Sequence, residues 1–252
     1  MSGDVVDNSG GSALGTLVLL TSIGIDRDSW QWLDLPTEMP VAMPEHPGHG
    51  SRPPAEGRYG LDELADRIVA EVPGPLHLAG VSMGGIVAQH AALRHPDRVR
   101  SMMLAGTGAS ADAETMEERA LAAERDGMAA RIEGIMPRWF TPETLAAEPE
   151  HPGVRYVRET LLKLDPRAFA NAWRAIGTHD VRDRLGELRL PTTCVAGAHD
   201  PAAPPERLGI LVDGIAGARS VVIEDAAHMM QLERPEAFSA ALHEHLSFAG
   251  AL

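Results

Sequence analysis

One serine in this chain stands in a setting that is typical of a nucleophile. Ser82 lies within Gly80-Val-Ser-Met-Gly84, a G-x-S-x-G pentapeptide between an apolar run and a helical-looking stretch. A serine on a tight turn between a strand and a helix is held away from the backbone, so its hydroxyl can meet a substrate. The glycines let strand, turn and helix approach without Cβ collisions. We therefore predict that Ser82 is a nucleophile; the alternative is a glycine-rich turn that happens to contain a serine.

A serine hydroxyl is a weak nucleophile and needs a base, usually a histidine, within hydrogen-bond reach. The chain has 11 histidines. His228 differs from the others because it follows an apolar run at 220–224, within a short loop. Loops at the carboxyl edge of a parallel sheet are where reacting groups gather. This placement predicts His228 as the base; otherwise it is an ordinary loop histidine.

The base needs an acid that orients its imidazole. Asp200 comes just past the apolar run at 192–197 and is the predicted partner of His228. Its main competitor, Asp225, lies only three residues before His228. The alternative role for Asp200 is that of a turn-forming aspartate before Pro201.

Acyl transfer also needs two backbone N–H donors for the developing oxyanion. One is expected from Met83, the residue after the nucleophile, and the other from the loop at 21–24. Within that loop, Ile23 is the predicted donor. The alternative for Ile23 is an apolar wall residue, and it can serve as both.

Apolar runs that alternate with helical patterns are expected to position these residues. The runs lie at 16–20, 40–43, 76–81, 99–105, 192–197 and 220–224. Such alternation predicts an α/β fold with a mostly parallel sheet flanked by helices. Residues 110–185 break the rhythm with proline-punctuated helical segments, which predicts an inserted helical lid. The predicted division is a core at 1–109, with 1–15 mobile, a lid at 110–185, and the rest of the core at 186–252.

The overall composition narrows the class of partner. Lys and Arg total 22 against 36 Asp and Glu, a formal net charge of −14. That balance argues against nucleic acid and anionic membranes, both of which need clustered positive charge. The single cysteine, Cys194, forms no intramolecular disulfide. We see neither a secretory signal nor an apolar run long enough to span a membrane, so a cytoplasmic protein with a small-molecule substrate is expected.

Several of these stretches together resemble the α/β-hydrolase superfamily. They are Leu19-Leu-Thr-Ser-Ile-Gly24, Gly48-His-Gly50, the pentapeptide around Ser82, Gly197-Ala-His-Asp200, and His228 followed by Glu233-Arg-Pro-Glu-Ala-Phe238. The resemblance implies an α/β-hydrolase fold with a helical lid inserted. The order Ser82, Asp200, His228 is also the order typical of that fold.

Within the superfamily, three stretches are similar to the 3-oxoadipate enol-lactonases and their relatives. They are Thr21-Ser-Ile-Gly24, Arg138-Trp-Phe-Thr-Pro142 and Asp165-Pro-Arg-Ala-Phe-Ala-Asn-Ala-Trp173. This narrower resemblance implies hydrolysis of a small cyclic enol ester, with no cofactor and no metal. Such a substrate carries a carboxylate, for which Arg138 is the candidate partner and Trp139 a candidate contact. The alternative for Arg138 is a solvent-exposed arginine on the surface of the lid. The alternative for Trp139 is a buried residue that anchors the core of the lid.

Other functions remain open at this point. A general carboxylesterase, or a carbon–carbon hydrolase acting on a vinylogous ketone acid, would use the same three residues. A non-catalytic ligand receptor is a further alternative, although the complete Ser82, Asp200 and His228 set argues against it. A metal-dependent lactonase lacks its usual sequence signature here, because His46 and His49 are better explained by a turn.

Overall fold

A six-stranded sheet forms the centre of the computed structural model, which describes residues 14–252. The strand order is β2-β1-β3-β4-β5-β6, and all neighbouring strands are parallel. The strands are β1 (Thr16–Leu20), β2 (Val41–Ala42), β3 (Leu76–Val81), β4 (Val99–Ala105), β5 (Thr192–Gly197) and β6 (Arg219–Ile223). The predicted α/β class and parallel sheet are confirmed. Four strands have the predicted bounds, whereas β2 is shorter and β6 begins one residue earlier.

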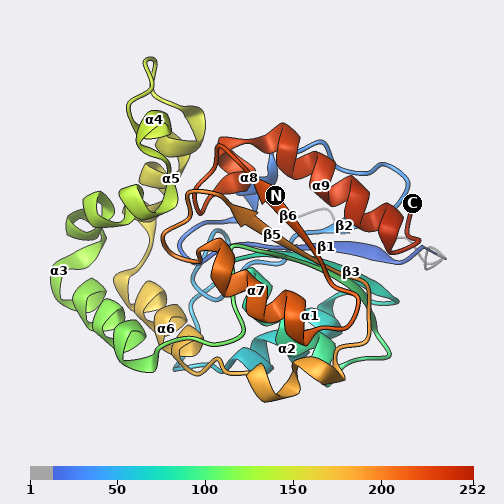
Figure 1. Ribbon diagram of the computed structural model, residues 1–252. Helices are drawn as coiled ribbons and strands as arrows, with labels where there is room; N and C mark the ends of the chain where they lie inside the picture. The colour runs from blue at the N-terminus through green and yellow to red at the C-terminus, as the bar shows by residue number, and fades with distance from the viewer. Residues whose placement is uncertain (1–13) are drawn as a thin grey trace.

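Alternating side chains of each strand enter two separate cores, as the two-residue period of a strand requires. In β1, Leu17 and Leu19 join one core, and Val18 and Leu20 join the other. Figure 1 shows the corresponding layers, with helices over the face that carries Leu17 and Leu19 and over the face that carries Val18 and Leu20. These are α9 (Pro235–Phe248) on the first face, and α1 (Leu61–Glu71), α2 (Met83–Arg94) and α7 (Pro205–Gly214) on the second.

Helix α1 shows how the sequence pattern produces this packing. Its buried residues include Leu61, Leu64, Ala65 and Ile68, which fall at i, i+3, i+4 and i+7 on one face. This spacing is the expected apolar stripe of an amphipathic helix. The polar side chains of α1 therefore remain on the solvent side, while the stripe packs against α2 and the sheet.

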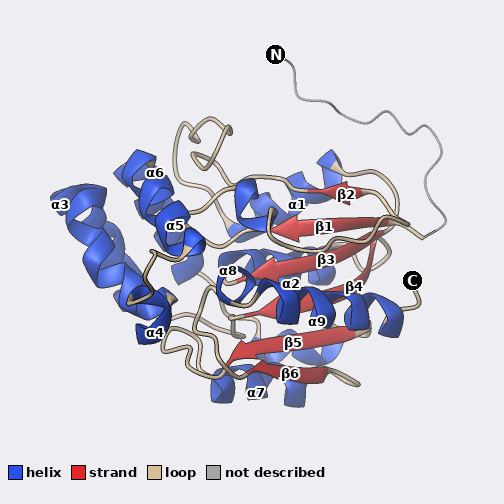
Figure 2. Ribbon diagram, turned by 90° about the horizontal axis from the view of Figure 1, so that it is seen from above, coloured by secondary structure: helices blue, strands red, loops and turns tan. Residues whose placement is uncertain are grey.

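A helical segment at 113–177 stands apart from these layers. Figure 2 shows it beyond the arrowheads of the strands, at their carboxyl ends. Its helices are α3 (Ala113–Trp139), α4 (Pro142–Leu145), α5 (Pro152–Lys163) and α6 (Pro166–Gly177). The last three begin at a proline, because proline suits the first helical position. Helix α3 is kinked at Gly127, whose φ is +72°.

An antiparallel bridge between Ser110 and Asp180 joins the two ends of this segment. The bridge lies near the predicted boundaries of the lid, although the division at 110 and 185 stays a prediction. The remaining short helices are η1 (Arg27–Trp30), η2 (Arg182–Glu187) and α8 (Met230–Glu233). Most of the segment 1–15, expected to be mobile, lies outside the described residues. Among the residues described, no helix has the length and apolar character needed to cross a membrane.

Candidate active site

Ser82 lies on a strained turn between β3 and α2. Its φ and ψ are 54° and −113°, and it is the sole non-glycine residue with a positive φ within 14–252. Such a conformation costs about 1–3 kcal/mol and is characteristic of functional sites. The Ser82 N–H donates to the carbonyl oxygen of Ala105, at the end of β4, over 2.8 Å. The backbone at Ser82 is therefore fixed to the neighbouring strand.

Two glycines of the pentapeptide make this turn possible. A Cβ on Gly80 would lie 2.3 Å from the carbonyl carbon of Gly84, and one on Gly84 would lie 2.0 Å from the carbonyl oxygen of Leu20. Both distances are too short for any side chain. The glycine pattern is thus explained by close approach of β3, α2 and the end of β1.

His228 and Asp200 form a buried pair. Nδ1 of His228 lies 2.7 Å from Oδ2 of Asp200, and their side chains are 5% and 0% exposed. The other carboxylate oxygen, Oδ1, accepts from the N–H groups of Ala202 and Ala203 at 2.7 and 2.9 Å. Because an ionised carboxylate only accepts, the proton sits on Nδ1, and Nε2 of a neutral imidazole is left as an acceptor.

The pKa of Asp200 follows from these surroundings. Burial by itself would raise the pKa of this carboxyl, but the attraction of His228 and the three hydrogen bonds outweigh burial, so the pKa of Asp200 is lowered. An ionised Asp200 beside the imidazole favours the positive charge that His228 would gain as a base. Asp225, the competing acid, is exposed and makes no such contact in the described structure.

The serine and the pair meet around the end of β4. Ala105 accepts the hydrogen bond from Ser82, and a Cβ on the next residue, Gly106, would lie 3.2 Å from Nδ1 of His228 and 3.4 Å from Oδ2 of Asp200. Ser82 and His228 also line one cavity of about 210 Å³. The structure therefore brings together the three residues that the sequence singled out, although their catalytic roles stay predictions.

One predicted oxyanion donor, Met83, directly follows Ser82, and the other, Ile23, lies at the same cavity as Ser82. Met83 is the first residue of α2, where N–H groups have no acceptor within the helix and the helix dipole is positive. The contact between Gly84 and Leu20 shows that the N-terminus of α2 packs on the end of β1, from which the loop carrying Ile23 begins.

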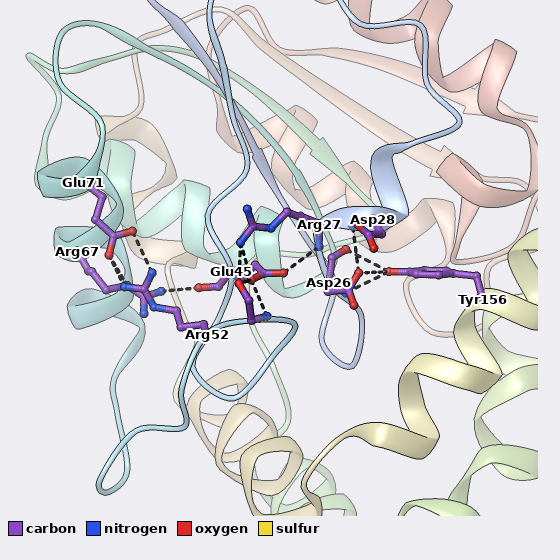
Figure 3. A network of polar contacts seen from close by, with 9 residues as sticks. Asp26, Arg27, Asp28, Glu45, Arg52, Arg67, Glu71 and Tyr156 are labelled. Carbon is purple, nitrogen blue, oxygen red and sulfur yellow. Dashed lines mark hydrogen bonds and ion pairs between the residues drawn. The ribbon is translucent and has the colours of Figure 1, made fainter. Parts of the chain in front are cut away.

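A network of polar contacts fixes the chain just beyond this loop (Figure 3). The Tyr156 hydroxyl, on α5, donates to Oδ1 of Asp26 over 2.8 Å. Nη2 of Arg27 donates to Oε2 of Glu45 over 2.9 Å, and the Ser51 N–H donates to the same oxygen over 2.9 Å. These contacts tie the loop after β1 to the loop after β2 and to the helical segment.

Comparison with known proteins agrees with this architecture. A family model described as "Alpha/beta hydrolase family" matches residues 17–241, most of the chain. The chain belongs to the alpha/beta hydrolase family. The resemblance stated from the sequence is thereby confirmed.

Relatives of this hydrolase include proteins named as methyl ester esterases and proteins named as enol-lactonases. A pimeloyl-[acyl-carrier protein] methyl ester esterase of Neisseria meningitidis serogroup A is 32% identical over 82% of this chain and 68% of its own length. The 3-oxoadipate enol-lactonase 2 of Acinetobacter baylyi is 27% identical over 90% and 86%. The crystal structure of the enol-lactonase from Burkholderia xenovorans LB400 has a TM-score of 0.87 and 29% identity, covering 94% of each chain.

In this hydrolase, the two predicted substrate contacts also line the cavity. Both Arg138 and Trp139 are lining residues. Trp139 is in addition a buried core residue, and its carbonyl oxygen accepts from the Met229 N–H over 2.9 Å. This hydrogen bond fixes the end of α3 next to His228. Trp139 can therefore both anchor the helical segment and line the cavity.

Sequence reasoning missed three further arginines of the cavity. Arg119, Arg131 and Arg207 line it together with Arg138. Arg119, Arg131 and Arg138 all lie on α3, but the kink at Gly127 interrupts their helical spacing. In the sequence, the one sign of a basic cavity is that arginines cluster in a single segment of an acidic chain. That clustering does not show which of these arginines face the cavity.

Proposed function

We propose that this hydrolase is a serine hydrolase that cleaves a small carboxylate-bearing enol-lactone or a related ester. The observation that carries the proposal is the buried His228–Asp200 hydrogen bond of 2.7 Å beside a cavity that Ser82 also lines. A hydroxyl, an imidazole with a free nitrogen and an oriented carboxylate form the set needed for acyl transfer.

The first half of the reaction is attack on the ester carbonyl. Nε2 of His228 takes the Ser82 hydroxyl proton as Oγ bonds to the carbonyl carbon, and Asp200 stabilises the imidazolium that results. The N–H groups of Ile23 and Met83 bind the oxyanion. Removal of one such donor costs about 3–4 kcal/mol in the transition state of comparable enzymes.

The second half breaks the ester bond and then frees the acyl group from Ser82; in a lactone the leaving oxygen stays on the same molecule as the acyl group. When the tetrahedral intermediate collapses, the bond to the leaving oxygen breaks and His228 returns its proton to that oxygen. An enol formed in this way tautomerises to a ketone. Water then attacks the acyl group on Ser82, with His228 again as base, and frees the acid and the serine.

The proposed substrate follows from the cavity and from the relatives. Arg138 offers a guanidinium for a carboxylate and Trp139 an apolar wall. The helices at 113–177 would act as a lid over this cavity. Relatives named as enol-lactonases support a lactone. Those named as methyl ester esterases favour a second candidate, a carboxylesterase for an open-chain ester.

A panel assay separates these candidates. The purified protein is offered a carboxylate-bearing enol-lactone, a methyl ester of a dicarboxylic acid, a neutral aryl ester and a vinylogous ketone acid, with Ser82→Ala as the control. We expect the highest kcat/KM for the enol-lactone, and no turnover by Ser82→Ala. Preference for the methyl ester would establish the carboxylesterase, and cleavage of the ketone acid would establish a carbon–carbon hydrolase. Binding without any turnover would replace the proposal with a receptor.

A further inference from the structure

The cavity beside Ser82 has an unusual charge for so acidic a chain. Among the described residues, four arginines line it and no aspartate or glutamate does. The chain as a whole carries a formal net charge of −14. A local excess of guanidinium groups against that background indicates a ligand that supplies negative charge.

Two of the four arginines already have partners. The Arg207 guanidinium donates to the carbonyl oxygen of Ser110. Nη1 of Arg131 lies 3.8 Å from Oδ2 of Asp126. By contrast, within residues 14–252 no carboxylate pairs with Arg119 or Arg138. These two guanidinium groups therefore keep their N–H donors for a ligand.

Arg119 is held in place without a carboxylate. Its guanidinium carbon lies 4.8 Å from the ring centroid of Trp173, which is on α6. Phe169 in turn packs edge-on against Trp173, with the rings 5.6 Å apart and inclined by 83°. A cation over an aromatic face is bound through the charge and not through its N–H groups, so those donors stay free.

The charge of Arg119 is also uncompensated. Burial, followed by the repulsion of Arg138, Arg207 and Arg131, lowers the pKa of Arg119 to about 10. Arg119 still carries its positive charge at neutral pH. No acidic side chain among the described residues lies between these guanidinium groups to offset their repulsion. An anion bound between them would offset it.

We propose that Arg119, together with Arg138, binds the carboxylate of the substrate and makes the enzyme selective for acidic over neutral esters. This inference rests on the proposed function, and it adds Arg119 as a specificity-determining residue and Trp173 as the positioning residue beneath it. Ser82 and Arg119 line one cavity of about 210 Å³, so a single small molecule can present its ester carbonyl to Ser82 and its carboxylate to Arg119.

Two aryl esters of similar length test this selectivity: 4-nitrophenyl hydrogen glutarate and neutral 4-nitrophenyl pentanoate. In Arg119→Met, which keeps an apolar stem, we expect kcat/KM for the acidic ester to fall at least about tenfold, mainly through KM. The neutral ester should change less than about twofold. Arg119→Lys should recover part of the loss. The control is Arg155→Met, at an exposed arginine of α5 that pairs with Glu150, and it should leave both esters unchanged.

The positioning role of Trp173 has its own variants. Trp173→Leu removes the aromatic face and should raise KM for the acidic ester several-fold, while Trp173→Phe keeps a face and should restore most of the affinity. Equal losses for both esters in Trp173→Leu would show that the ring supports the fold alone, and would remove Trp173 from the inference.

Binding of glutarate itself separates this inference from the proposed function. By calorimetry, the wild type should bind glutarate, and Arg119→Met should bind it at least about tenfold more weakly, whether or not any ester is turned over. If the wild type hydrolyses esters but Arg119→Met keeps its ratio of acidic to neutral kcat/KM and its affinity for glutarate, the inference is wrong and the proposed function stands. If no ester is hydrolysed and glutarate binding still depends on Arg119, the proposed function is wrong and the anion site stands.

Discussion

Glu233 joins Thr141, at the base of the helical segment, to the loop that carries His228. Its Oε1 accepts from the N–H and the hydroxyl of Thr141 at 2.8 and 2.9 Å. Its Oε2 accepts from the Ala227 N–H at 2.6 Å, one residue before His228. Glu233 is only 3% exposed, so these donors have no ready access to water as a substitute. The carboxylate therefore fixes the position of His228 relative to the helices above it.

Glu233→Gln should weaken both the fold and catalysis. A glutamine presents one N–H₂ group to one set of donors, which leaves buried N–H groups without an acceptor and destabilises the protein by about 1–3 kcal/mol. We expect a lower Tm by calorimetry and a lower kcat, because His228 loses its fixed backbone. Glu236→Gln, at an exposed position of α9, is the matched control. An unchanged Tm and kcat in Glu233→Gln would contradict this role.

Asp200→Asn should leave the fold largely intact and remove most of the activity. The amide no longer holds the proton on Nδ1 of His228, and the imidazole loses its charge partner. A loss of about 10³–10⁴ in kcat is expected from this change in comparable enzymes. Steady-state kinetics with Asp225→Asn as the comparison variant also tests the competing acid. If Asp225→Asn loses the activity and Asp200→Asn keeps it, the assignment of the acid is wrong.

Gly24→Ala should disturb the loop after β1, which carries Ile23, and the helices that pack on it. Gly24 has a φ of +85°, and a Cβ there would lie 2.8 Å from Cδ2 of Leu161 and 3.1 Å from Cη2 of Trp139. We expect a destabilisation of about 1–3 kcal/mol and a reduced kcat, because the adjacent Ile23 N–H moves. Gly57→Ala is the control, since a Cβ there meets nothing within 4 Å. Wild-type Tm and kcat in Gly24→Ala would exclude the tight packing described for this loop.

Acidification should destabilise the protein through its buried histidines, among them His179 and His245. Burial, with a smaller contribution from His90, lowers the pKa of His179 to about 4, and burial followed by the repulsion of His77 lowers the pKa of His245 to about 4. Below the ordinary value of 6.5, the unfolded chain therefore binds protons that the folded chain does not. The free energy of unfolding should be constant above that pH and fall as the pH drops toward 4.

Urea unfolding at several pH values measures this effect. Each histidine contributes a slope of up to about 1.4 kcal/mol per pH unit between pH 6 and pH 4.5. His245→Gln removes one of these groups and should flatten the dependence by about that amount. If the free energy of unfolding of His245→Gln depends on pH as steeply as that of the wild type, His245 takes up its proton equally in the folded and unfolded states.

The sequence was most informative where a reactive side chain directly follows an apolar run. Ser82, Asp200 and His228 each follow an apolar run, and parallel strands bring their carboxyl ends to one edge, so their meeting could be predicted without coordinates. The strand bounds of β1, β3, β4 and β5 were predictable for the same reason, because each is a short buried run between turn residues.

Contacts that depend on how helices pack were not predictable in this way. Thr141 and Glu233 are 92 positions apart, and no spacing rule connects them. Arg119 lines the cavity where α3 packs on α6, which carries Trp173. Many arginines of the segment at 113–177 have the same local pattern, so only tertiary structure separates those that line the cavity from those in solvent.

Covalent labelling of Ser82 is the decisive test of a nucleophilic serine in this protein. The purified protein is treated with a fluorophosphonate. Intact mass gives the number of adducts, and peptide mapping gives their position. The control is the Ser82→Ala variant, after its circular dichroism spectrum has been shown to match that of the wild type. We expect one adduct, on Ser82, with loss of esterase activity in proportion to labelling and no adduct in Ser82→Ala. Full labelling at another residue, or ester turnover that persists in Ser82→Ala, would contradict the role of Ser82 as the nucleophile.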